Sequence, residues 1–217
     1  MVRTKLCGLG TEADVHAAVD AGADALGFIT DVSVDTPREV PPERAATLAA
    51  SVPPFVTTVA VTIPERVGGA VDVADRVDPD ALQIHGEFSP DEVREIRERA
   101  GVDVIVALDA DEPDRARDLD GAADALLVDS LSDDGAGGTG ETHDWAATRE
   151  LRESLSTPLV LAGGLTPENV REAVETVAPF AVDVASGVER AAEPGRKDHD
   201  ALGAFVREAT QATETGT

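Results

Sequence analysis

The sequence predicts an α/β fold, a single (β/α)8 barrel, from its length, the character of its apolar runs and a repeated unit. The chain has 217 residues, 42% of them hydrophobic, which suffices for the core of one domain. The apolar runs show no polar alternation, as is typical of parallel strands that are buried on both faces. Eight such runs alternate with helix-like segments, without a composition break or a linker. Eight units of this kind close most economically into a barrel, and a doubly wound open sheet is the competing arrangement.

The expected strands are short apolar runs that end at glycine or at polar residues. They are Val2–Cys7, Ala25–Ile29, Phe55–Val61, Ala81–Ile84, Asp103–Leu108, Ala125–Val128, Leu159–Ala162 and Ala181–Ala185. The expected helices have apolar residues at helical spacing. They follow Thr11, Ser89 and Thr166, or lie near Glu43–Ser51, Glu65–Arg76, Pro113–Leu119, Trp145–Leu155 and Asp198–Ala209. We expect the barrel domain to span residues 1–209 and residues 210–217 to form a flexible C-terminal tail.

Two of the helices have clear start signals. Thr11 is followed three residues later by Asp14, the spacing of a capping box. Ser89 precedes a proline at the first helical position and Glu92 at the third, so the chain should enter a helix there.

A glycine turn follows the seventh strand and indicates a phosphate site. Leu159–Ala162 ends at Gly163 and Gly164, and Thr166 with Pro167 suits the start of a helix. Such a junction gathers backbone N–H groups at the positive end of a helix dipole, where a phosphate binds well. Taken alone, two glycines could equally serve only to turn the chain.

In a barrel the carboxyl ends of all strands share one rim, and the loops that follow them build the site. The residues expected on this rim are Cys7, Arg38, His85, Asp129, Gly163, Gly164, Ser186 and Gly187. The sequence thus predicts that a thiol and a carboxylate lie on one rim beside two glycine turns. We expect the long irregular segment Ser130–His143 to be functional or mobile.

Each of these side chains also has a plainer explanation. Cys7 could be a buried core thiol, since cysteine is among the most buried residue types. Asp129 could cap the segment that follows it, and His85 could serve packing or substrate contact more readily than catalysis. Arg38 could form a surface ion pair, or it could bind a carboxylate with two parallel hydrogen bonds.

Charge and composition exclude several classes of partner. The formal net charge is −25, from 18 basic and 43 acidic residues, so a nucleic-acid partner is disfavoured. The acidic residues are spread over every expected helix, which resembles a salt-adapted surface. No apolar run reaches the roughly 20 residues of a membrane span. A single cysteine and a start without a signal-peptide core lead us to expect a cytoplasmic protein.

Neither a metal nor a cofactor is expected. The four histidines have no ligand-like spacing: His16, His85, His143 and His199. Walker, dinucleotide and serine-elbow motifs are absent from the sequence.

The motifs along the chain together resemble a known family. They read KLCG, GADALGF, LQIHGE, LLVDS, GGTGETHDW, LAGGLTPENV and VDVASGVE followed by PGRKD. In this order, from residue 3 to about 207, they strongly resemble the phosphoribosylanthranilate isomerase family of tryptophan biosynthesis. The resemblance implies a barrel without metal or cofactor that acts on a small phosphorylated substrate, as a monomer or a homodimer.

The resemblance also implies an Amadori rearrangement of N-(5'-phosphoribosyl)anthranilate to 1-(o-carboxyphenylamino)-1-deoxyribulose 5-phosphate. Asp129 corresponds to the general acid that opens the furanose ring, and Cys7, as thiolate, to the general base that removes the C2 proton. These roles require a raised pKa at Asp129 and a lowered one at Cys7. Arg38 matches the arginine that binds the anthranilate carboxylate. The turns at residues 163–164 and 186–187 match the phosphate cradle.

Two departures from the family pattern bear on binding. The loop before Arg38 carries Asp31 and Asp35 in place of a more aromatic and basic stretch, which should weaken binding of an anion at low salt. Ala185 stands where a serine is common, so one hydroxyl near the phosphate turn is missing.

Two other functions remain open from the residues alone. One is a different phosphate-binding barrel enzyme, an epimerase or a catalyst like indole-glycerol-phosphate synthase. The synthase chemistry needs lysine and glutamate catalysts, yet the only lysines are Lys5 and Lys197, and an epimerase would want a metal cluster. The other is a non-catalytic module that binds a phosphorylated ligand.

Overall fold

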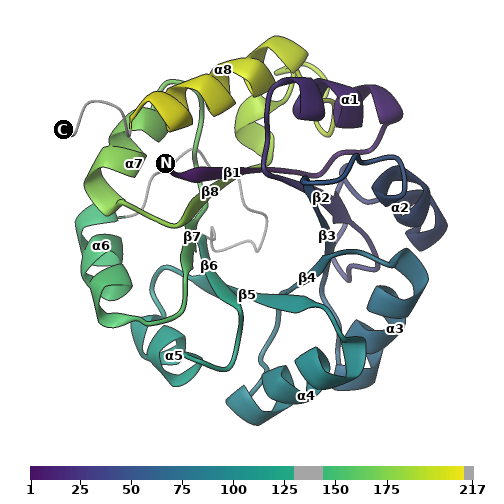
Figure 1. Cartoon of the computed structure of the whole chain (residues 1–217), viewed down its shortest axis with the longest axis vertical. Helices are drawn as coiled ribbons and strands as arrows, with labels where there is room; N and C mark the ends of the chain where they lie inside the picture. Colours follow the sequence, from purple (N-terminus) through teal and green to yellow (C-terminus); the bar gives the residue numbers. More distant parts are fainter. Residues whose placement is uncertain (130–143, 213–217) are drawn as a thin grey trace.

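The computed structural model describes residues 1–129 and 144–212, and its parallel strands form a closed barrel (Figure 1). The strands pair in chain order from β1 to β8, and β8 returns to β1. Their bounds are β1 Arg3–Cys7, β2 Ala25–Ile29, β3 Thr57–Thr62, β4 Ala81–Ile84, β5 Asp103–Asp109, β6 Ala125–Asp129, β7 Leu159–Leu161 and β8 Ala181–Val184. The predicted (β/α)8 barrel is confirmed, and the open sheet is excluded.

A helix follows each strand, and the helices surround the barrel (Figure 1). They are α1 Glu12–Asp20, α2 Pro42–Ala49, α3 Val67–Val77, α4 Pro90–Ala100, α5 Pro113–Asp118, α6 Trp145–Ser154, α7 Val170–Val177 and α8 His199–Gln211. A short 3-10 helix, η1 Ser186–Val188, lies between β8 and α8. Within residues 1–129 and 144–212, none of the helices combines the length and the apolar character that a bilayer crossing requires.

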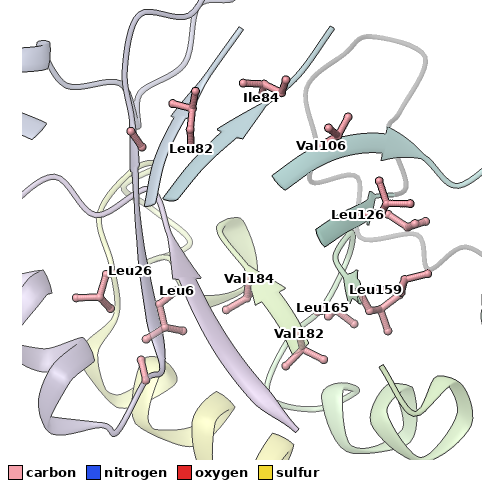
Figure 2. Packing of buried hydrophobic residues seen from close by; sticks show 14 of the residues in the cluster. Leu6, Leu26, Leu82, Ile84, Val106, Leu126, Leu159, Leu165, Val182 and Val184 are labelled. Carbon is pink, nitrogen blue, oxygen red and sulfur yellow. The ribbon is translucent and has the colours of Figure 1, made fainter. Parts of the chain in front are cut away.

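The core has one larger and two smaller parts, which lie on opposite faces of the strands because side chains alternate along each strand. The larger part lies between the strands and the helices; Figure 2 shows several of its residues, such as Leu6, Leu26 and Leu126, on strands around the barrel. The smaller parts are formed by residues of the opposite parity, many of them alanine. Since these interior residues are small, they leave room for longer polar side chains inside the barrel.

The strand register determines which polar residues meet in that interior. Lys5 of β1 lies opposite Asp183 of β8, and Cys7 of β1 lies opposite Gly27 of β2. Lys5 and Cys7 are two residues apart, so both project from the interior face of β1.

The predicted helix starts at Thr11 and Ser89 are confirmed. The Thr11 hydroxyl accepts a hydrogen bond from the Asp14 N–H and donates one to the Asp14 carboxylate at 2.6 Å. Ser89 and Glu92 form a reciprocal capping box. The chemistry of these side chains alone specified both starts.

The expected start of β3 at Phe55 is wrong. Phe55 is fully exposed and has a φ of 75°, which no strand residue adopts. The two prolines before it have no N–H to donate, and the hydrogen-bonded ladder begins where Thr57 N–H donates to the Asp24 carbonyl. The strand therefore starts two residues later than its apolar character indicates.

The expected helix start at Thr166 is also wrong, because α7 begins at Val170. The Thr166 hydroxyl accepts from the Glu168 N–H and so caps a separate turn. The Asn169 side chain stabilises this turn by accepting from the Thr166 N–H and donating to the Gly164 carbonyl. The glycine turn is consequently farther from the helix dipole than the sequence suggested.

At the carboxyl end of the chain, α8 runs to Gln211, two residues into the segment 210–217 that was expected to be a tail. Ala212 is buried and packs with the main core. Residues 213–217 lie outside the described part of the chain.

Candidate active site

A cavity of about 140 Å³ lies at the carboxyl ends of the strands. All the residues expected on the rim line it: Cys7, Arg38, His85, Asp129, Gly163, Gly164, Ser186 and Gly187. They come from six of the eight strand ends and the loops that follow, and the barrel alone brings them together. Gln83 and Asp183 also line the cavity and were not predicted.

Cys7, the last residue of β1, is a buried thiol that faces this cavity, with 4% of its surface exposed. Burial raises the pKa of Cys7 most strongly; Lys5 and Lys197 oppose this, and Asp183 adds to it. The outcome is a pKa above the usual range of a thiol, whereas the sequence-based mechanism required a lowered one. The reason is that burial among apolar strands outweighs the nearby cations.

The mechanism requires a raised pKa at Asp129, the last residue of β6, and the structure provides one. Burial raises its pKa to about 6, with further contributions from the negative charges of Asp183 and Asp109. Its Oδ1 atom is buried and has no hydrogen-bond partner among the described residues. Asp129 can therefore carry a proton near neutral pH and present it to a molecule in the cavity.

His85, just beyond β4, is a neutral imidazole in this environment. Burial lowers its pKa to about 4, and the Lys5 ammonium contributes. One ring nitrogen lies 3.0 Å from the side-chain nitrogen of Gln83. An uncharged ring of this kind suits contact with a substrate better than binding of an anion by charge.

Arg38 is held by a carboxylate of the chain itself. Its Nε donates to Glu189 Oε1 at 2.7 Å and one terminal nitrogen donates to Oε2 at 3.1 Å. Lys197 also contacts Glu189 at 3.0 Å, and it donates to the Ala185 carbonyl. Gly8 packs against the aliphatic part of Arg38, where a Cβ would stand 3.0 Å from Cδ. Glu189 thus fixes the orientation of the guanidinium at the edge of the cavity.

The two glycine turns lie against each other. Gly163 and Gly164 have φ values of 84° and 62°, which glycine adopts without strain. A Cβ on Gly187 would stand 1.9 Å from the Leu165 carbonyl oxygen, so only glycine fits there. The turns that follow β7 and β8 are therefore in direct contact beside the cavity.

Sequence reasoning missed the charged residues beneath and beside the rim. Lys5 and Asp183 form an ion pair of 3.1 Å, and both side chains are more than nine-tenths buried. The period of two along a strand was the available signal, since Lys5 precedes Cys7 by two residues. No local signal pointed to Glu189, because its partner Arg38 is distant in the chain.

The described residues contain no cluster of histidine, cysteine and carboxylate side chains that could hold a metal ion. Both lysines are bound to carboxylates, and neither lines the described cavity. The expected irregular segment Ser130–His143 lies outside the described residues.

The family follows from the sequence as a whole. The sequence model described as N-(5'-phosphoribosyl)anthranilate (PRA) isomerase matches residues 4–208. The chain belongs to the N-(5'-phosphoribosyl)anthranilate isomerase family. It is 55% identical over 214 residues to the isomerase of that name from Halorubrum lacusprofundi, with 99% of both chains covered.

Solved structures of phosphoribosyl anthranilate isomerase share the fold. That of Thermotoga maritima is 38% identical with a TM-score of 0.85, covering 97% of this chain and 100% of that chain. A second, 37% identical with a TM-score of 0.83 and the same coverage, is in complex with reduced 1-(o-carboxyphenylamino)-1-deoxyribulose 5-phosphate. The family resemblance stated from the motifs is confirmed, and the chain is an isomerase.

Proposed function

We propose that this chain converts N-(5'-phosphoribosyl)anthranilate into 1-(o-carboxyphenylamino)-1-deoxyribulose 5-phosphate, a step of tryptophan biosynthesis. The observation that carries the proposal is one cavity lined by a thiol, a protonatable carboxyl and two adjoining glycine turns. Membership of the isomerase family supports the same reaction.

The reaction needs one acid and one base on the same sugar. Protonated Asp129 gives its proton to the furanose ring oxygen, the C1–O bond breaks, and the substrate nitrogen forms an iminium with C1. Cys7, as thiolate, takes the proton from C2, and the C2–H electrons form the C1–C2 double bond of an enolamine. Tautomerisation of the enolamine to the ketone completes the aminoketose. General acid and base catalysis of this kind contributes about 10²- to 10⁴-fold.

The binding roles follow the chemistry of the substrate. Backbone N–H groups at Gly163, Gly164, Ser186 and Gly187 bind the phosphate, since they lie at two adjoining turns. Arg38 binds the anthranilate carboxylate through the part of the guanidinium that Glu189 does not occupy, and His85 contacts the substrate as a neutral ring. The exposed Asp31 and Asp35 oppose an anionic substrate, and this repulsion weakens as salt rises.

The two pKa shifts have a consequence for the pH dependence. The pKa of Asp129 is about 6 and that of Cys7 lies above the usual range of a thiol. The pair therefore carries one proton at neutral pH, mainly on sulfur. The reactive form, a thiolate facing a protonated carboxyl, has the same number of protons and is the minor tautomer. Turnover should rise as the pH passes about 6 and fall again only when the pH exceeds the Cys7 pKa. A pH–rate profile at constant high salt measures both limbs.

The test of the proposed function is an isomerase assay. The unstable substrate is generated from anthranilate and phosphoribosyl pyrophosphate with the preceding transferase, and loss of its fluorescence is followed in multimolar KCl. We expect loss that is proportional to the concentration of the chain and exceeds spontaneous decay in its absence. Binding of the substrate without turnover would favour the non-catalytic phosphate module instead.

A further inference from the structure

The interior of the barrel contains a lysine that the proposed reaction does not use. Lys5 projects inside the barrel from β1, with 3% of its surface exposed, and it does not line the described cavity. Its ammonium lies 3.1 Å from Asp183 Oδ1 of the neighbouring strand β8. Taking an isolated pair of this kind out of water is costly, so its presence calls for a reason other than stability.

Gly27 of β2 brings this lysine close to Cys7. A Cβ at Gly27 would stand 2.8 Å from Cys7 Sγ and 3.2 Å from Lys5 Nζ. The sulfur and the ammonium therefore both lie against the same bare face of Gly27. A larger residue there would push the two groups away, so the missing side chain is what permits their approach.

We propose that Lys5, held in place by Asp183, is the counter-ion of the Cys7 thiolate. Lys5 acts through Cys7 and does not touch the substrate, so it is a positioning residue. This inference rests on the proposed function only in taking Cys7 to be the base. Its physical basis is that a cation beside a thiol in a low-dielectric interior favours the charged form of the thiol.

Each charged group near Cys7 shifts the pKa of the thiol in a direction that can be tested. Lys5 lowers the pKa of Cys7 against the dominant effect of burial, Asp183 raises it, and Lys197 lowers it from the connection after β8. Asp129 from β6, His85 from β4 and Arg38 from the connection after β2 face the same cavity. The Lys5 ammonium also lowers the pKa of Asp129, and Asp183 raises it.

Titration of the thiolate by its ultraviolet absorbance tests the proposal without any substrate. The chain has one cysteine and no tyrosine, so neither a second thiol nor a tyrosinate contributes to the signal. In Lys5→Met the midpoint should move to higher pH, and reactivity towards iodoacetamide at neutral pH should fall about tenfold or more. In Asp183→Asn, which keeps Lys5, the midpoint should move to lower pH. Arg3→Met is the matched control, since it removes a cation from the exposed end of the same strand and should leave the midpoint unchanged.

Opposite shifts in the two variants are not expected from a merely structural role. An unchanged midpoint in folded Lys5→Met, or a midpoint that moves the same way in both variants, overturns the proposal. If Lys5→Met does not fold, Lys5→Gln, which also lacks the charge, takes its place, and an unchanged midpoint in that variant overturns the proposal.

The proposed function can fail separately from this inference. If the wild-type chain shows no isomerase turnover while the titration shifts as described, the counter-ion role stands and the isomerase reaction does not. If turnover is present, the pH–rate profile gives a second readout. Both limbs should move to higher pH in Lys5→Met, and unmoved limbs contradict the proposal.

Discussion

At the scale of a single residue, Asp129 is a buried carboxyl that lowers the stability of the protein when it is ionised. A carboxyl at the end of an apolar strand would be more stable as a neutral group. Its pKa is raised from 3.8 to about 6, so the folded state holds the proton more tightly than the unfolded chain does. The stability that this proton provides is complete below about pH 4 and is lost as the pH rises through about 6.

Replacement of this carboxyl by a neutral side chain should therefore stabilise the protein, and should do so only at pH values above about 6. We expect Asp129→Asn to raise the free energy of unfolding by about 2–3 kcal/mol at pH 8 and by little at pH 4. Chemical unfolding in high KCl at the two pH values measures the difference. The exposed Asp20→Asn serves as the control and should show no such pH dependence. Equal effects of Asp129→Asn at both pH values would show that the carboxyl is not perturbed.

The individual residues also show what the sequence can predict and what it cannot. All the expected rim residues reach the cavity, because the strand ends of a barrel converge whatever the sequence between them. Lys5 could have been found from its spacing to Cys7, since side chains alternate along a strand. Glu189 could not, because its contact with Arg38 depends on how two distant loops are packed.

At the scale of the elements, starts are predictable where a side chain bonds the adjacent backbone and unpredictable where tertiary contacts decide. Thr11 and Ser89 begin their helices as their chemistry indicates. Thr166 has the same chemistry, but the Asn169 side chain bonds back to the Thr166 N–H and the Gly164 carbonyl and so stabilises a separate turn. The β3 ladder begins at Thr57 because of its partner strand and not because of its own apolar run.

The contact between the two glycine turns leads to a prediction for binding. Gly187→Ala would place a methyl group 1.9 Å from the Leu165 carbonyl oxygen, so one of the turns must move. We expect kcat/KM for the phosphorylated substrate to fall about 100-fold, because displacement of a binding group by about 1 Å has that effect. Steady-state kinetics measures the loss.

Gly69→Ala is the matched control for that variant. Gly69 lies within α3, and its nearest neighbour to an added Cβ is Pro64 at 3.5 Å, which is ordinary contact. Its kinetics should remain those of the wild type. Full activity in Gly187→Ala would mean that the contact between the turns is not needed for phosphate binding.

At the scale of the whole molecule, the large negative net charge has the strongest effect on stability. With 43 acidic and 18 basic residues, most carboxylates have no cation to pair with. Several of the ion pairs that do form, such as Arg99 with Glu95 and Arg149 with Glu153, are about half exposed, so each adds little stability. Repulsion among the remaining carboxylates opposes the compact state until salt screens it.

Stability should consequently rise with salt. We expect the melting temperature to increase by about 10 °C or more between about 0.1 M and about 3 M KCl. Calorimetry or circular dichroism along a KCl series gives the result. A melting temperature that stays flat over the series would contradict a salt-adapted surface.

The overall architecture was predictable because eight similar units leave few alternatives, whereas the protonation of the site was not. The pKa of Cys7 depends on burial, Lys5 and Asp183, and their balance cannot be read from the sequence even though the spacing of Lys5 to Cys7 can. The proposed reaction requires above all that the Cys7 sulfur and the Asp129 carboxyl act on the same sugar.

The most direct measurement is the turnover number of Cys7→Ser and of Asp129→Asn with N-(5'-phosphoribosyl)anthranilate in high salt, with folding checked by circular dichroism. Each variant should lose about 10³-fold or more of the wild-type turnover, since each lacks one of the two proton-transfer groups. Full turnover in either folded variant would contradict the account.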